Sequence, residues 1–180
     1  MSPFSTHVFR FVAALALVAG LVCPRPAAAQ AVTEPALKAA FLVNFVKFTQ
    51  WPIEQLPPGA PVVLCVSDAA VAEALGTVAA QEVDGRRLVV RPIAPDAAWT
   101  GCTVAYVHGL DRRRTQAWLA AMPPGVLTVS DLDDFAAHGG IIQLIAVDGR
   151  MRFAVNVSEA DRRRVRLSAK LLQLARIVRD

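Results

Sequence analysis

The segment Pro61-Val-Val-Leu-Cys-Val-Ser-Asp68 carries an unbroken apolar run between a proline and two residues that favour the start of a helix. A run of this length without polar alternation is typical of a strand that is buried on both faces, as in a parallel sheet. The side chains of Ser67 and Asp68 offer oxygens that can cap the helix expected over residues 69–80. The segment therefore predicts the first strand–helix unit of an α/β domain.

Strands and helices continue to alternate on both sides of this segment. Apolar runs predict further strands over residues 87–93, 103–107, 126–129, 141–147 and 151–155. Helices are expected over residues 33–50, 110–122, 130–138 and 167–178, with a short helical stretch capped by Ser158. Asp148-Gly149 is a strong hairpin signal between the last two strands. The pattern predicts a three-layer α/β fold, with a mainly parallel sheet, helices on both faces and a C-terminal antiparallel hairpin.

The first and last helices are each expected to turn one apolar stripe inward. Helical spacing assigns to the first stripe Leu37, Phe41, Asn44, Phe45 and Phe48. Asn44 is interpreted as a buried amide that is bonded to the backbone, with a ligand contact as the alternative. The stripe of the last helix contains Leu171, Leu174, Ala175 and Val178.

The first 29 residues have the features of a secretory signal peptide. A start that carries Arg10 precedes the apolar run 11–22, and Ala27-Ala-Ala29 supplies an Ala-x-Ala cleavage signal. The run is too short to span a bilayer, although an uncleaved anchor is the alternative. Cleavage after Ala29 would make Gln30 the first residue of a single domain over residues 30–180, located in the periplasm. Cys23 follows Val22 rather than a small residue, so lipoprotein processing is not expected.

Composition places the chain among globular proteins. Apolar residues make up 54% and charged residues 19%, which is too apolar for a disordered chain. The formal net charge is only +4, and the arginine runs 112–114 and 162–164 are short enough to be solvated helix faces. We therefore expect no nucleic-acid partner.

Polar residues follow three of the expected parallel strands, where ligands of such sheets bind. They are Ser67-Asp68, His108-Gly109 and Ser130-Asp131. A hydrolase would draw on Ser130, His108 and Asp131, but neither serine lies in a Gly-x-Ser-x-Gly motif, and Ser-Asp before a helix is also a helix cap. No paired histidines, Cys-x-x-Cys or glycine-rich phosphate loop is present. No catalytic residue, metal or cofactor is therefore expected.

Cys65 and Cys102 remain once the leader is removed, and both are flanked by apolar residues. A bridge between them would persist in an oxidising compartment. In plain parallel register the two residues would lie about 10 Å apart, too far to bond, and a register offset would remove this objection. Two buried free thiols are the alternative.

Four stretches of the chain have distinctive sequences. They are residues 38–52 (KAAFLVNFVKFTQWP), 126–131 (VLTVSD) with Phe135 and Gly139-Gly-Ile-Ile142, 152–156 (RFAVN) and 167–178 (LSAKLLQLARIV). These stretches resemble the YfiR/HmsC-like family of periplasmic proteins, and the resemblance covers almost the whole chain after the leader, in the family's order.

The resemblance implies a regulator that works by binding. Its best-understood members restrain an inner-membrane diguanylate cyclase by binding the periplasmic portion of that enzyme, which lowers cyclic di-GMP and biofilm formation. An OmpA-like outer-membrane lipoprotein is a further implied partner, and a homodimer is expected by analogy. Cys65 and Cys102 match one cysteine pair of the family, which favours the bridge. The second pair of some members has no counterpart in residues 141–155.

Two other functions are weighed against this regulator. A periplasmic accessory protein that binds a small ligand would use the polar strand ends at Asp68, His108 and Asp131. An enzyme is the third hypothesis.

Overall fold

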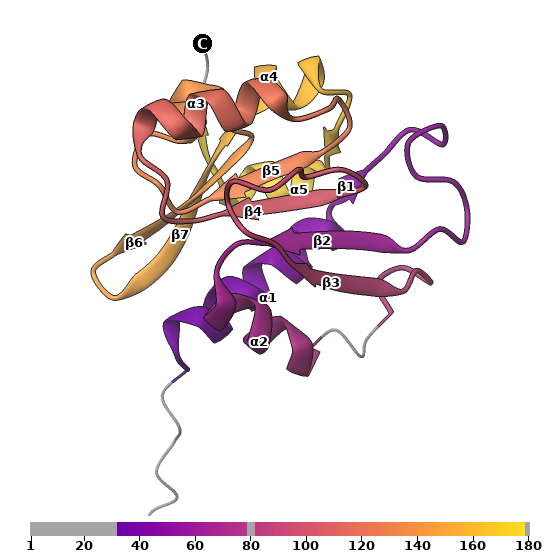
Figure 1. Ribbon diagram of the computed structural model, residues 1–180, viewed down its shortest axis with the longest axis horizontal. Helices are drawn as coiled ribbons and strands as arrows, with labels where there is room; N and C mark the ends of the chain where they lie inside the picture. Colours follow the sequence, from indigo (N-terminus) through magenta and orange to yellow (C-terminus); the bar gives the residue numbers. More distant parts are fainter. Residues whose placement is uncertain (1–31, 79–81, 179–180) are drawn as a thin grey trace, which may run out of the picture. The chain divides into compact units, whose positions relative to one another are not determined.

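A seven-stranded sheet organises the computed structural model, which describes residues 32–78 and 82–178 (Figure 1). The strand order is β3-β2-β4-β5-β6-β7-β9. The strands are β2 (Val62–Val66), β3 (Leu88–Pro92), β4 (Val104–Val107), β5 (Leu127–Ser130), β6 (Ile142–Val147), β7 (Arg150–Asn156) and β9 (Arg176–Val178). A second, two-stranded sheet pairs β1 (Thr49–Gln50) with β8 (Arg166–Leu167). The expected signal peptide and its cleavage site at Ala29 and Gln30 lie outside the described residues.

The predicted fold class is confirmed. All pairs from β3 to β6 are parallel, and β6 and β7 form the expected antiparallel hairpin. Asp148 and Gly149 turn this hairpin with positive φ angles of 49° and 69°, as a two-residue type I′ turn requires. β2 lies between β3 and β4, and four of its five residues are buried, as the apolar run predicted.

Helices cover both faces of this sheet. They are α1 (Glu34–Lys47), α2 (Ala69–Val78), α3 (Arg112–Ala121), α4 (Val157–Arg162) and α5 (Ala169–Leu174), with a 3-10 turn η1 (Ala136–His138). Along β2, Leu64 and Val66 join a core with α1 and α2, whereas Cys65 faces the core beneath α3. Figure 1 shows α3 on the opposite side of β4 from α1 and α2. None of the helices within the described ranges is long and apolar enough to cross a membrane.

The inward face of α1 differs from the predicted stripe. Asn44 is exposed rather than buried, and Lys38 is buried on the inward face beside Leu42 and Phe45. The helix is apolar on nearly every side, so hydrophobic spacing alone does not fix its rotation. It also ends at Lys47 instead of continuing to residue 50, because the next residues form β1.

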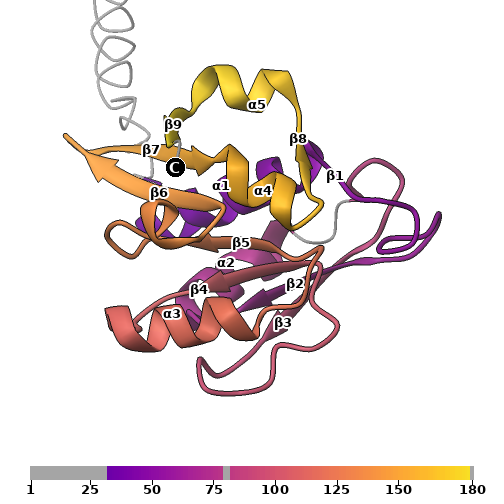
Figure 2. The ribbon, with the colours of Figure 1, turned by 90° about the horizontal axis from the view of Figure 1, so that it is seen from above.

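The C-terminal stretch 167–178 is not one helix. It divides into β8, the six-residue α5 and β9, which pairs in parallel with β7. Figure 2 shows α5 above β7 and β9 at this end of the sheet. Leu171 is buried, but Leu174, which was predicted to share its face, is 72% exposed. The open edge of β7 offers backbone hydrogen bonds that a sequence pattern does not reveal.

Asn156, not Ser158, caps α4. Its Oδ1 accepts a hydrogen bond from the Glu159 amide at 2.8 Å, and its Nδ2 donates to the Ala136 carbonyl at 2.9 Å. The side chain is completely buried, so it joins two segments while satisfying a helix end.

We expect Asn156→Ala to lower the free energy of unfolding by about 2 kcal/mol, because a cap and a buried hydrogen bond are lost together. Ser158→Ala is the matched control and should change it by less than about 0.5 kcal/mol. Urea unfolding followed by circular dichroism measures both. Equal losses in the two variants would contradict the assignment of the cap.

Candidate functional site

Three polar residues predicted from strand ends do gather at one edge of the sheet. Asp68 follows β2, His108 follows β4 and Asp131 follows β5, and these strands are parallel neighbours. Asp68 caps α2, since its Oδ1 accepts from the amides of Ala70 and Val71 at 2.9 and 3.1 Å. Asp68 therefore acts as the helix cap that its position predicted. The other two residues, His108 and Asp131, contact each other directly.

Asp131 is the centre of this group. Its Oδ1 lies 2.8 Å from Nδ1 of His108, and its Oδ2 lies 2.6 Å from Nζ of Lys38. Nζ of Lys38 also lies 2.8 Å from Oε1 of Glu34, one helical turn earlier on α1. The side chains of Lys38 and Asp131 are only 9% and 14% exposed, whereas that of His108 is 47% exposed. The site is thus a mostly buried ion pair with a histidine at its solvent side.

Burial and pairing compete at both charges of this ion pair. Burial, the largest single influence, would raise the pKa of Asp131, but the hydrogen bonds from Lys38 and His108 and the electrostatic attraction of both groups together outweigh burial and hold that pKa below its ordinary value. Burial would lower the pKa of Lys38, but hydrogen bonds to Asp131 and Glu34 outweigh it and raise that pKa. Both shifts favour the charged forms, so the pair stabilises the folded chain at neutral pH.

The two serines do not complete a catalytic arrangement with His108. Ser130 is fully buried, donates to the Val107 carbonyl at 2.7 Å and accepts from the Leu132 amide at 3.1 Å. Ser67 Oγ accepts from the backbone amide of His108 at 2.8 Å. The hydroxyls therefore hold strand ends in place. Within residues 32–78 and 82–178, no group of three or more histidine, cysteine or acidic side chains is arranged to hold a metal ion.

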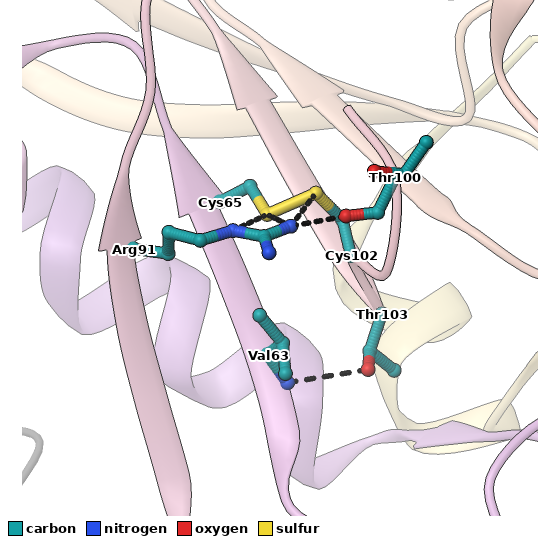
Figure 3. The surroundings of a disulfide bond; sticks show 6 residues. All are labelled: Val63, Cys65, Arg91, Thr100, Cys102 and Thr103. Atoms are coloured by element: carbon teal, nitrogen blue, oxygen red, sulfur yellow. Dashed lines mark hydrogen bonds between the residues drawn. A yellow bond between two sulfur atoms is a disulfide. The ribbon is translucent and has the colours of Figure 1, made fainter. Parts of the chain in front are cut away.

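Cys65 and Cys102 form the predicted disulfide, with an S–S distance of 2.07 Å and a Cα–Cα distance of 5.8 Å (Figure 3). No register offset is needed for this bond, because Leu64 pairs with Val104 in plain parallel register. The chain instead turns before β4, with Gly101 at φ +70°, so that Cys102 leaves the strand direction and lies over β2. A backbone turn, not a shifted strand, brings the two sulfurs together.

The side chain of Arg91, in β3, contacts both sulfurs of this bridge. Its Nη2 lies 3.0 Å from the sulfur of Cys65 and 3.0 Å from that of Cys102, and the same nitrogen donates to the Thr100 carbonyl at 2.5 Å (Figure 3). Arg91 is the register partner of Cys65, which explains its position. One side chain therefore ties together β3, the disulfide and the turn before β4.

The chain matches a known protein family over most of its length. The sequence profile of the YfiR/HmsC-like family matches residues 35–176. The chain belongs to the YfiR/HmsC-like family. The match begins in α1 and ends in β9, so the YfiR/HmsC-like domain comprises both sheets and all five helices.

Other comparisons add little to this assignment. Among solved structures, a conserved domain protein from Vibrio cholerae O1 biovar El Tor is 14% identical, with a TM-score of 0.49. The match covers 82% of this chain and 60% of that protein, so this chain spans less than two thirds of its length. The search of curated proteins found no match.

Sequence reasoning missed two residues of the YfiR/HmsC-like domain that hold its polar groups in place. Lys38 stands inside the family-like stretch of α1, but it was not singled out, because lysine side chains are rarely buried. Arg91 lies in the middle of the apolar segment 87–93, where a charge needs a partner, and this was the one signal available.

Proposed function

We propose that this YfiR/HmsC-like protein is a periplasmic regulator that binds and restrains the periplasmic portion of an inner-membrane diguanylate cyclase. Restraint would lower cyclic di-GMP and biofilm formation. The single observation that carries the proposal is the family match over residues 35–176, which runs from α1 to the first residue of β9. The protein would act through its surface rather than through a catalytic centre.

Two features support the proposed periplasmic location. The leader over residues 1–29 is expected to direct export, with cleavage between Ala29 and Gln30. The bridge between Cys65 and Cys102 fits an oxidising compartment, since such bonds are rare in reducing ones. An OmpA-like outer-membrane lipoprotein is proposed as the partner that removes the regulator from the cyclase, and a homodimer as its resting form.

The test is the intracellular level of cyclic di-GMP in a strain that lacks this gene. We expect the level to rise, and to return when the full chain is supplied. A matched control supplies residues 30–180 without the leader, which should fail to restore the level if the protein acts in the periplasm. An unchanged level in the deletion strain would overturn the proposed role.

A direct binding test complements the genetic one. In living cells, the protein should be crosslinked to the periplasmic portion of the cyclase, and the crosslinked band should be absent from the strain without the gene. Elevated cyclic di-GMP without any such crosslink would place the effect upstream of the cyclase and contradict direct restraint.

The alternative ligand-binding role has less support at the strand ends. Asp131 is already paired with Lys38 and His108, and Asp68 caps α2, so these groups satisfy one another. An enzymatic role would need Ser130, whose hydroxyl is bonded to the backbone.

A further inference from the structure

The disulfide has a positive charge beside both of its sulfurs (Figure 3). Nη2 of Arg91 lies 3.0 Å from each sulfur, and Nε lies 3.3 Å from the sulfur of Cys65. Within residues 32–78 and 82–178, this guanidinium forms no ion pair with a carboxylate. A neutral sulfur is only a weak hydrogen-bond acceptor, whereas a thiolate is an anion that a nearby arginine stabilises. The charge is therefore placed where it favours the opened, reduced form of the bridge.

The two cysteines differ in access and in their contacts with Arg91. Cys65 lies inside β2, has no exposed surface and is approached by two nitrogens of the guanidinium group. Cys102 lies in the turn before β4, is 8% exposed and helps to line a hollow of about 280 Å³. Gly101 and Pro123 also line this hollow. Cys102 is thus the more accessible cysteine, and Cys65 is the one better placed to carry a negative charge.

We propose that this bridge is a site of thiol–disulfide exchange with a fixed direction, in which Cys102 takes the incoming thiol and Arg91 holds Cys65 as the leaving thiolate. The thiolate of a small thiol attacks Sγ of Cys102 and forms a new S–S bond there. The bond between the two cysteines breaks, and its electron pair leaves on Sγ of Cys65, where the guanidinium stabilises it. The exchange site does not depend on the proposed contact with a cyclase.

A purely structural role for Arg91 predicts the opposite effect. Arg91 also donates to the Thr100 carbonyl, so it braces the turn that carries Cys102. If bracing the closed bridge is its main effect, its removal should make the bridge easier to reduce. If it stabilises the thiolate, its removal should make the bridge harder to reduce. The sign of the change therefore separates the two roles.

The first experiment measures the equilibrium between bridge and thiols in mixtures of reduced and oxidised dithiothreitol, with thiols counted by alkylation and mass spectrometry. We expect Arg91→Met to lower the equilibrium constant for reduction about tenfold. Arg91→Lys keeps a positive charge and should stay within about threefold of the parent. The matched control is Arg87→Met, which removes an exposed arginine one residue before β3 and should change nothing. An unchanged or larger constant in Arg91→Met, or equal constants in Arg91→Met and Arg91→Lys, would overturn the role of the charge.

The second experiment identifies the cysteine that is attacked. The folded, oxidised protein is incubated briefly with reduced glutathione and quenched in acid. The unfolded chain is then alkylated with N-ethylmaleimide and its peptides are analysed by mass spectrometry. We expect glutathione on Cys102 and the maleimide on Cys65, in at least about tenfold excess over the reverse pattern. Equal amounts of the two patterns, an excess of the reverse one, or no glutathione on either cysteine would contradict the proposed exchange.

Discussion

A variant in which Cys65 and Cys102 are both replaced by alanine should unfold with a free energy about 4 kcal/mol lower than that of the oxidised parent. The bridge joins residues 37 positions apart, and such a link removes much of the freedom of the unfolded chain. Cys65 is fully buried, so the loss of its sulfur also leaves unfilled volume in the core beneath α3. Urea unfolding at pH 7, followed by circular dichroism, measures the difference.

Reduction provides the control for this prediction. Dithiothreitol should destabilise the parent by a similar amount and should leave the double variant unaffected. In addition, denatured oxidised protein that starts at Gln30 should show no thiol that reacts with a labelling reagent until a reductant is added. Free thiols before reduction, or equal unfolding midpoints for parent and variant, would show that the bridge is absent in solution.

Asp131→Asn should lower the free energy of unfolding by about 3 kcal/mol at pH 7. The substitution keeps the shape of the side chain but removes the negative charge, which leaves the mostly buried Lys38 with only Glu34 as its partner. The matched control is Asp134→Asn. Asp134 forms an exposed pair with Arg112 at 3.6 Å, and its loss should cost less than about 1 kcal/mol. Asparagine also tolerates the positive φ of 56° at that position.

The stabilisation that the Asp131 carboxylate gives to the fold should be lost in acid. The pKa of Asp131 in the folded chain lies below the ordinary value of 3.8, so the carboxylate stabilises the fold fully above that value. This stabilisation disappears as the pH falls through the lower, folded-state pKa, where the wild-type carboxyl takes up a proton. The stability curves of wild type and Asp131→Asn should therefore converge in acid. A constant gap down to pH 2 would contradict the pairing of the charged forms.

The elements that the sequence predicted well are those fixed by local chemistry. The strand expected over residues 62–66 has the same bounds as β2, because Pro61 precedes the apolar run and the capping residue Asp68 follows it closely. The Asp148-Gly149 turn was equally local, since few residues tolerate its positive φ angles. Each of these signals needs no knowledge of the rest of the chain.

The predictions that failed depended on distant partners. The observed rotation of α1 places Lys38 against Asp131, which lies 93 residues away in sequence. The disulfide itself was predicted correctly, but the bend that brings Cys102 to Cys65 was not foreseen, because it depends on a turn rather than on the pattern of either strand. Leucine-rich residues 167–178 satisfy a helical pattern, yet their last part forms β9, because it pairs with the edge of β7 that faces away from β6. Local propensity was overridden by tertiary structure in each case.

The pairing of β1 with β8 has a consequence for how quickly the chain can fold. Thr49 and Gln50 pair with Leu167 and Arg166, and the Phe48 carbonyl accepts a hydrogen bond from the Ser168 amide at 2.9 Å. The segment that secures the end of α1 is therefore synthesised long after α1 itself. Contacts of such long range slow folding, so we expect the pairing of β1 with β8 to be among the last steps of folding.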